Sequence, residues 1–155
     1  YLRTPASPYL LVDSSKAILN SGTLTFESIF NNVPTGIYLI TLNHRNSIGV
    51  WSKSGGESLI CGITNYIDLT TASSKVYGNN QIQVAISPVR FAIYSGDVNQ
   101  DGIVDITDVS LIYNDAAIFN SGYVPTGVTG DGFTDLTDGV FAENNAKDFV
   151  SVIIP

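Results

Sequence analysis

The run of residues 96–108, which reads G-D-V-N-Q-D-G-I-V-D-I-T-D, constrains the fold of this chain most. Counted from Asp97, oxygen-bearing side chains occupy positions 1, 3, 5, 9 and 12, and Gly102 occupies position 6. This is the spacing of a twelve-residue calcium loop, in which glycine allows a sharp turn and position 7 contributes a carbonyl. The predicted ligands are Asp97, Asn99, Asp101, Ile103 through its carbonyl, Asp105 and Asp108.

Position 12 of this loop departs from the usual pattern, because Asp108 stands where a longer glutamate is common. The alternative interpretation of the run is an acidic turn that lies in solvent. The number of coincident positions favours the calcium loop over that alternative.

The composition of the chain limits its classes of partner. Its 155 residues carry a net charge of −7, which disfavours nucleic acid, because Lys and Arg must neutralise phosphates in such complexes. Charged residues make up 14% and hydrophobic residues 44%, a balance typical of a strand-rich secreted protein. No apolar run approaches the roughly 20 residues of a membrane helix. We therefore expect an extracellular or cell-surface protein without a membrane span.

The first residue and the single cysteine of the chain lead to two further expectations. The sequence starts at Tyr1 with neither Met nor a signal peptide, so we expect a processed piece of a longer precursor. Cys61 is the only cysteine, which excludes an internal disulfide and disfavours zinc. We expect a buried structural thiol at this position.

Residues 1–94 have the pattern of an antiparallel β-sandwich, with short β-rich runs separated by turn residues. Turn signals include Asn20-Ser21-Gly22 and Ser54-Gly55-Gly56. Alternation places Ile82, Val84 and Ile86 on one face of a strand. The predicted strands cover residues 9–12, 16–19, 24–30, 37–43, 48–53, 58–61, 81–86 and 90–94.

The stretch 32–53, with V-P-T-G-I-Y-L-I-T-L-N-H-R-N-S followed by W-S-K-S-G-G, resembles transthyretin-like or carboxypeptidase-regulatory-like sandwiches. These domains precede calcium-loop repeats in large secreted surface proteins. The resemblance implies that the V-P-T-G-I-Y segment is a turn that enters a central strand. It also implies that residues 1–3 are the end of a first strand.

Catalytic chemistry is not indicated in this part of the chain. His44 is the only histidine, and no nucleophile or carboxylate is placed beside it by the sequence, so a structural or surface imidazole is expected. Trp51 with Tyr9, Tyr38 or Tyr66 could form a sugar-stacking platform, although such residues lie more often in a core or at its rim. Carbohydrate is therefore a possible but unsupported ligand.

The calcium loop is the first of two copies that lie 30 residues apart. Shifting the chain by 30 residues aligns Asp101-Gly102 with Asp131-Gly132, Asp105 with Asp135, and Thr107-Asp108 with Thr137-Asp138. After the first loop, Val109 and Ile112 share the face of a short amphipathic helix. The sequence therefore predicts two loop-helix units.

This pair of units resembles the type I dockerin module over residues 96–150. The resemblance implies two calcium loops whose helices pack with pseudo-twofold symmetry. It assigns the same six residues of the first loop as ligands, with Ile103 acting through its carbonyl.

The second copy lacks two of the ligands of the first. Gly127 and Thr129 stand where the first loop has Asp97 and Asn99. Because calcium affinity follows the number and charge of the ligands, we expect a weaker site. Its remaining ligands are Asp131, Phe133 through its carbonyl, Asp135 and Asp138. We expect Leu136, Phe141 and Phe149 to pack in this unit whether or not it binds calcium.

Residues 151–155 form a short apolar segment that we expect to be a C-terminal strand. It either packs back on its own sandwich or docks on the sheet edge of a neighbour. The predicted organisation is a sandwich over 1–94, a dockerin-like domain over 95–150 and this strand. Only Ser95 and Gly96 follow Tyr94 before the loop, which leaves no flexible linker.

The sequence favours a non-catalytic, calcium-stabilised building block of the cell surface or of a filament, joined to a protein partner or to copies of itself. The alternative is a C-terminal module that anchors or targets a secreted hydrolase. No acid-base pair or nucleophile is visible outside the calcium loops, so an enzyme is not predicted.

Overall fold

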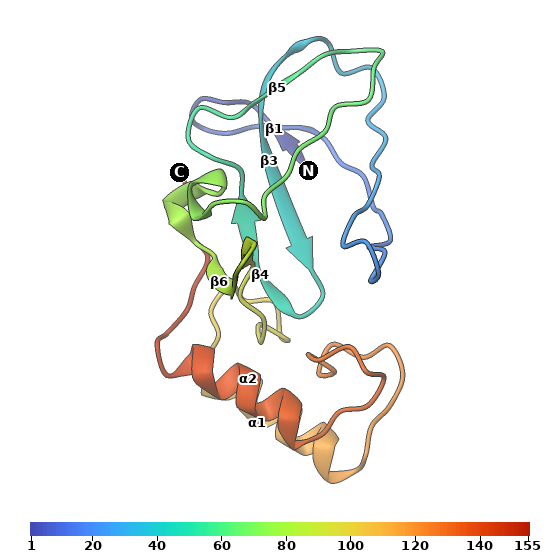
Figure 1. Ribbon diagram of the computed structural model, residues 1–155, viewed down its shortest axis with the longest axis vertical. Helices are drawn as coiled ribbons and strands as arrows, with labels where there is room; N and C mark the ends of the chain where they lie inside the picture. The colour runs from blue at the N-terminus through green and yellow to red at the C-terminus, as the bar shows by residue number, and fades with distance from the viewer.

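The computed structural model describes all of residues 1–155 and is mainly β, with antiparallel sheets and two helices. The strands occupy the upper part of the molecule in Figure 1, and the helices lie below them. The prediction of a mainly β chain with a small α part is confirmed at this level. No helix has the length and apolar character that crossing a membrane requires.

The larger sheet has five strands and is built around β3 (Gly36–His44). Its order is β2-β1-β3-β4, and β5 pairs with the first residues of β3. Leu2 of β1 pairs with Ile40, and Trp51 of β4 pairs with Thr41. The other strands of this sheet are β1 (Leu2–Arg3), β2 (Leu11–Asp13), β4 (Ser47–Trp51) and β5 (Glu57–Leu59).

A β-hairpin and two short 3-10 helices complete the β part of the chain. A hairpin of β6 (Ile82–Ile86) and β7 (Val89–Ala92) forms a separate two-stranded sheet. Two short 3-10 helices, η1 (Ser73–Lys75) and η2 (Tyr77–Asn79), precede it. The buried apolar side chains of the β part are few, so its interior is small. They are Leu2, Tyr38, Leu39, Ile48, Val50 and Val76.

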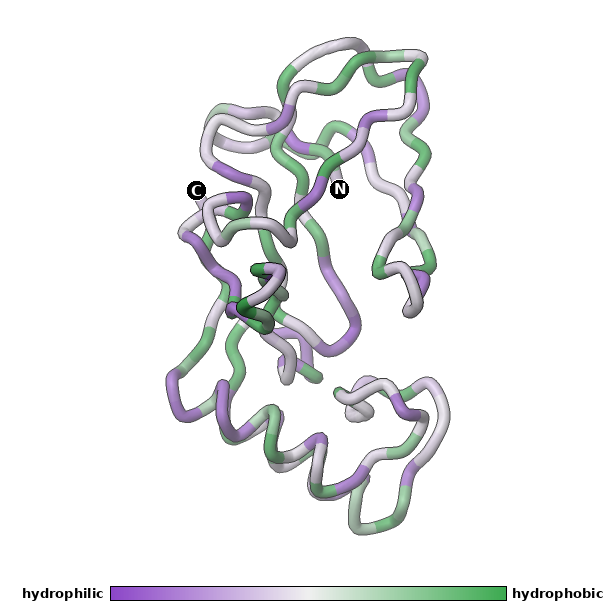
Figure 2. The backbone as a smooth tube through the Cα atoms, viewed as in Figure 1, coloured by the Kyte–Doolittle hydropathy of each residue, from purple (hydrophilic) through white to green (hydrophobic).

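Two predicted strands are wrong, namely 16–19 and 24–30. These segments contain no strand, and only one isolated bridge, between Asn20 and Thr25, lies there. Their apolar side chains are exposed, with Ile18 at 92% and Ile29 at 77%. Strand propensity depends on a neighbouring strand and a surface to pack on, and these residues have neither. Figure 2 shows that apolar and polar residues alternate along these segments.

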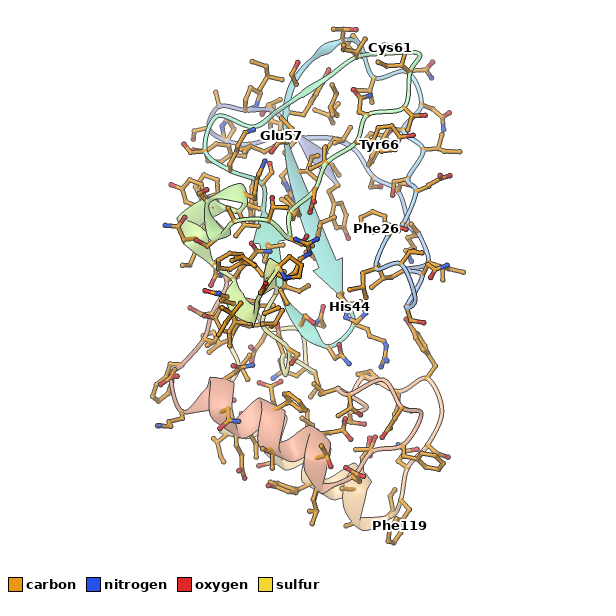
Figure 3. All side chains as sticks on the ribbon, viewed as in Figure 1. Phe26, His44, Glu57, Cys61, Tyr66 and Phe119 are labelled. Carbon is orange, nitrogen blue, oxygen red and sulfur yellow. The ribbon has the colours of Figure 1, made fainter.

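Of two other local predictions, one needs correction. The strand that contains Ile82, Val84 and Ile86 is present as β6, and all three side chains are exposed. Cys61 is exposed rather than buried, and Figure 3 places it at the end of the molecule farthest from the helices. In both places no other part of the chain covers the apolar side chains.

Helix α1 (Ile106–Ala117) and helix α2 (Leu136–Ala146) pack against each other, as the two-unit repeat predicts. The contact is a cluster of Val98, Val109, Ile112 and Ala142. Leu136, Phe141 and Phe149 do not pack, since they are 68%, 50% and 75% exposed. Ala142 is the member of the cluster that α2 supplies, and Ala146 packs against it. Both are small, and a Cβ at Gly139 of the same helix would lie 2.9 Å from the Tyr113 ring, so the helices approach closely.

The C-terminal segment lies on its own chain. After α2 it runs back up beside the 3-10 helices (Figure 1), and Asn80 Nδ2 donates to the Ser151 carbonyl at 2.9 Å. Ser151 forms one bridge with Ile103, and residues 152–155 are not a strand. Of the two alternatives for this segment, packing on its own chain is therefore the one observed.

Candidate metal centre

The loop of residues 97–108, called loop 1 below, is fixed to the end of the β part. The Ile48 amide donates to the Tyr94 carbonyl at 3.1 Å, and the Gly96 amide donates to the Asn46 carbonyl at 2.7 Å. Ser47 and Ser95 form an isolated antiparallel bridge between these bonds. No hinge separates loop 1 from the sheet, because each residue that precedes the loop is paired.

The turn of loop 1 is built by its own short polar side chains. Asn99 Oδ1 accepts from the Asp101 amide at 2.8 Å, and Asp101 Oδ1 accepts from the Ile103 amide at 3.0 Å. Gly102 has a φ of 91°, a left-handed conformation that glycine adopts without a steric penalty. These bonds explain why Asn or Asp occupies alternate positions before the glycine.

Asp108 closes the loop from its far end. Its side chain is fully buried, and Oδ1 accepts from the Val98 amide at 2.9 Å and from the Asn99 amide at 3.1 Å. Oδ2 accepts from the Asp105 amide at 3.0 Å, while Asp105 caps the helix by accepting from Thr107. Reciprocal capping of this kind satisfies the free amides at the start of α1. The twelfth residue of the loop therefore also fixes where the helix begins.

Asp97 is the buried carboxylate that the loop does not satisfy. Its side chain is 2% exposed, and Oδ2 accepts from the Gly102 amide at 3.1 Å. Oδ1 is buried and has no hydrogen-bond partner. Burial, followed by the nearby charge of Asp108, raises the pKa of Asp97 above its usual range. A buried carboxylate oxygen without a partner is costly, and a cation beside it would relieve that cost.

Ile103 directs its backbone toward the loop. Its neighbours pair with the C-terminal segment, because the Val104 amide donates to the Val150 carbonyl at 2.7 Å and the Val152 amide donates to the Gly102 carbonyl at 2.8 Å. In such an antiparallel pair the residue between these bonds points its own amide and carbonyl the other way. The Ile103 carbonyl is therefore on the loop side, as a position-7 ligand requires.

The loop does not gather its acids into a dense chelating cluster. No group of three or more His, Cys, Asp or Glu side chains lies in an arrangement that could hold a metal ion by itself. Asn99 Nδ2 donates to Asp101 Oδ2 at 2.9 Å, so an amide lies against one of the carboxylates. The donor set is mixed, with carboxylates, an amide and a carbonyl, which is the set that a hard cation such as calcium prefers.

Residues 127–138, called loop 2 below, have the same frame. The Thr129 and Asp135 amides donate to Asp138 at 2.7 and 2.9 Å, and the Phe133 amide donates to Asp131 at 3.0 Å. Asp135 caps α2 as Asp105 caps α1. Loop 2 has no counterpart of Asp97, because Gly127 occupies that position. Its polar side chains leave no buried oxygen without a partner.

Loop 2 is bound by the turn between β3 and β4. Arg45 Nη1 donates to the Val124 carbonyl, and its guanidinium lies 4.1 Å from the centre of the Tyr123 ring. Asn46 Nδ2 donates to the Gly127 carbonyl at 3.0 Å. In loop 1 the matching Asp97 carbonyl instead accepts from Gln100 Nε2 at 2.7 Å. The side chains of this turn thus hold the entrance of the loop that lacks a first carboxylate.

Each loop pairs with the chain segment that follows the helix of the other unit. Loop 1 pairs with the segment that follows α2, and loop 2 pairs with the segment that follows α1, since the Thr134 amide donates to the Asn120 carbonyl at 2.8 Å. A phenylalanine with positive φ follows each helix within three residues of its end, with φ values of 52° at Phe119 and 49° at Phe149. The 30-residue repeat in the sequence is therefore a repeat of backbone conformation and pairing.

The other residues singled out by the sequence do not assemble a catalytic group. His44 Nδ1 lies 3.4 Å from Ser47 Oγ, and no carboxylate adjoins the pair. Burial, and then the charge of Arg45, lowers the pKa of His44. Tyr9 lies edge-on to Trp51, with ring centroids 6.0 Å apart. Tyr66 is 92% exposed and joins no platform.

Sequence reasoning about the site missed two features of the β part, the contact of Arg45 with loop 2 and the proximity of Arg3 to Trp51. Neither has a local signal, because Arg45 is 79 residues from Val124 in the chain.

Comparison with protein-family models, with curated proteins and with solved structures finds no match.

Proposed function

We propose that this chain is a non-catalytic, extracellular, calcium-stabilised assembly module: a β-sandwich joined without a hinge to a dockerin-like pair of loop-helix units. One observation carries the proposal, the buried Asp97 Oδ1 that has no partner within a loop of calcium-type spacing. Loop 1 is the principal site, with Asp97, Asn99, Asp101, Ile103, Asp105 and Asp108 as ligands. Loop 2 is the weaker site, with Asp131, Phe133, Asp135 and Asp138.

Calcium has a structural role in this proposal. A bound ion offsets the charge of the acids in loop 1, and its binding is coupled to folding because the ligands converge only in the folded chain. At a free calcium concentration 100 times the dissociation constant, the free energy of unfolding rises by about 2.7 kcal/mol. Asn46 accepts a backbone hydrogen bond from Gly96, and Ser47 forms a β-bridge with Ser95. Because these contacts hold the residues that precede loop 1, part of this stabilisation reaches the sheet.

Matched substitutions in the two loops test the calcium sites. Asp101 and Asp131 occupy the same position of their loops, and both are exposed. Asp101→Ala should lower calcium affinity by tenfold or more and remove most of the calcium-dependent rise in Tm. Asp131→Ala should lower calcium affinity by less than threefold and should reduce the calcium-dependent rise in Tm by only a few degrees. Titration calorimetry and thermal unfolding with and without chelator measure these effects, and equal losses would refute the ranking.

We further propose that copies of this module assemble through the β6–β7 hairpin. The outer edge of β6 pairs with no other strand, although the Phe91 amide of β7 donates to the Thr70 carbonyl, and Val84 and Ile86 of β6 are 61% and 85% exposed. Edges of this kind pair readily with other strands. Val84→Lys together with Ile86→Lys should abolish the assemblies that sedimentation and electron microscopy detect at high protein concentration. A wild-type chain that stays monomeric at all concentrations would sink this part of the proposal and leave the calcium site intact.

A further inference from the structure

A cleft of about 390 Å³ lies between one face of the larger sheet and loop 1. Arg3, Asn43 and Trp51 line its sheet wall, and Asp97 and Asp101 line its loop wall. Its volume falls within the roughly 300–1,000 Å³ of small-ligand sites. In Figure 1 the yellow segment that contains loop 1 lies beside the end of the β3–β4 hairpin. Two of the predicted calcium ligands thus share a cavity with an arginine.

Both walls of the cleft contain a buried polar atom without a partner. On the loop wall it is Asp97 Oδ1, and on the sheet wall it is Arg3 Nε. Arg3 Nη1 donates to the Tyr9 carbonyl at 3.1 Å, which leaves the rest of the guanidinium free. Lys53 and Glu57 form the single ion pair of the chain, so Arg3 is not paired with Asp101 across the cleft. A ligand can therefore lie between the two walls.

The surroundings of Trp51 indicate which ligand fits. The Arg3 guanidinium lies 5.1 Å from the centre of the Trp51 ring, and Tyr9 meets the same ring edge-on. These contacts occupy the indole, which disfavours stacking of a sugar on it. They also hold the guanidinium in one direction. A guanidinium fixed in this way can donate a charge-assisted hydrogen bond to a carboxylate oxygen.

We propose that this cleft binds a carboxylate, with one oxygen on the calcium ion of loop 1 and the other on Arg3. The inference rests on the calcium site proposed above. Calcium takes six to eight oxygen ligands, and loop 1 supplies six residues, of which Asp108 is shorter than the usual glutamate. A ligand oxygen completes the coordination. An acidic peptide and a small free acid share this chemistry.

Trp51 reports directly on the cleft, because it is the only tryptophan of the chain. Its fluorescence is followed in saturating calcium at constant ionic strength during titration with succinate and with the capped peptide acetyl-Gly-Glu-Gly-amide. Succinamide and the matching Gln peptide serve as neutral controls. Both carboxylates should give a saturable change that chelator abolishes, whereas the amides should give none. The tighter of the two carboxylates identifies the source of the ligand.

Variants of Arg3 separate this inference from the calcium site. Arg3→Gln should weaken carboxylate binding tenfold or more and leave calcium affinity within twofold. Arg3→Lys keeps the charge but loses the planar guanidinium that Trp51 and Tyr9 hold in place, and should give an intermediate loss. The control Arg90→Gln changes an exposed arginine of β7 and should alter neither affinity.

Three results would overturn the inference while calcium still binds: no response to either carboxylate, an equal response to the amides, or wild-type binding by Arg3→Gln. Carboxylate binding of equal strength in chelator would overturn the bridging role of calcium. Absence of calcium binding itself would overturn the proposed function, and this inference with it.

Discussion

Asp97 and Asp108 are both buried carboxylates of loop 1, yet their surroundings differ. Both oxygens of Asp108 accept backbone hydrogen bonds, so this residue closes the loop and caps α1. Asp97 keeps one buried oxygen without a partner. These hydrogen bonds compensate for the burial of Asp108, whereas one oxygen of Asp97 stays uncompensated, a cost that the proposed cation would relieve.

At the residue scale, His44 makes the stability of the protein depend on pH. Its pKa is lowered in the folded chain from the ordinary value of 6.5, first by burial and then by Arg45. When the pH falls below 6.5, the unfolded chain binds the proton more readily, so the folded state loses stability until His44 is protonated there too. Denaturant unfolding at pH 7.5 and 5.5 measures this loss.

His44→Gln should unfold with a smaller loss of stability over the same interval, because the carboxylates are common to both proteins. Parallel pH dependences of the wild type and the variant would show that His44 contributes nothing to the loss. Asn46 and Ser47, the polar neighbours of His44, are unchanged in this comparison.

At the scale of elements, the C-terminal segment joins η2 to loop 1. Gly78 of η2 has a φ of 68°, and a Cβ at this position would lie 2.7 Å from Ile153 Cγ2. On its other side the segment pairs with loop 1, since Val152 donates to Gly102. A disturbance at Gly78 is therefore expected to reach the loop.

Gly78→Ala and its control Gly62→Ala measure the importance of this contact. Both glycines have positive φ, but a Cβ at Gly62 would meet nothing within 4 Å. Gly62→Ala should cost only the left-handed conformation, about 1–2 kcal/mol. Gly78→Ala should add a packing cost of about 1–3 kcal/mol. Equal losses in chemical denaturation would show that the segment does not bear on stability.

At the scale of the whole molecule, local patterns were the ones that the sequence predicted well. The repeat, the two helices and the central strands follow from spacing, capping residues and turns that act over a few positions. Residues 16–19 and 24–30 were predicted as strands because they are short β-rich runs separated by turn residues. That assignment is wrong, since no neighbouring strand or packing surface is there.

The long-range part of the site was beyond the sequence. The spacing singles out the oxygen-bearing side chains of loop 1 as predicted ligands, but it could not reveal that Asp97 Oδ1 lacks a partner. It likewise could not place Arg45 on loop 2, or Arg3 in the cleft beside loop 1. These features depend on how the sheet packs against the loops, which a single sequence does not specify.

Loop 1 buries Asp97, and we propose that it does so to bind a calcium ion. Thermal unfolding of the wild type and of Asp97→Asn, each with calcium and with chelator, tests this proposal. In chelator, Asp97→Asn should have the higher Tm, because it removes a buried charge that lacks a partner. In calcium, the wild type should have the higher Tm, because only it keeps the first ligand. Two curves that keep the same order in both conditions, with a wild-type Tm that calcium does not raise, would contradict the account.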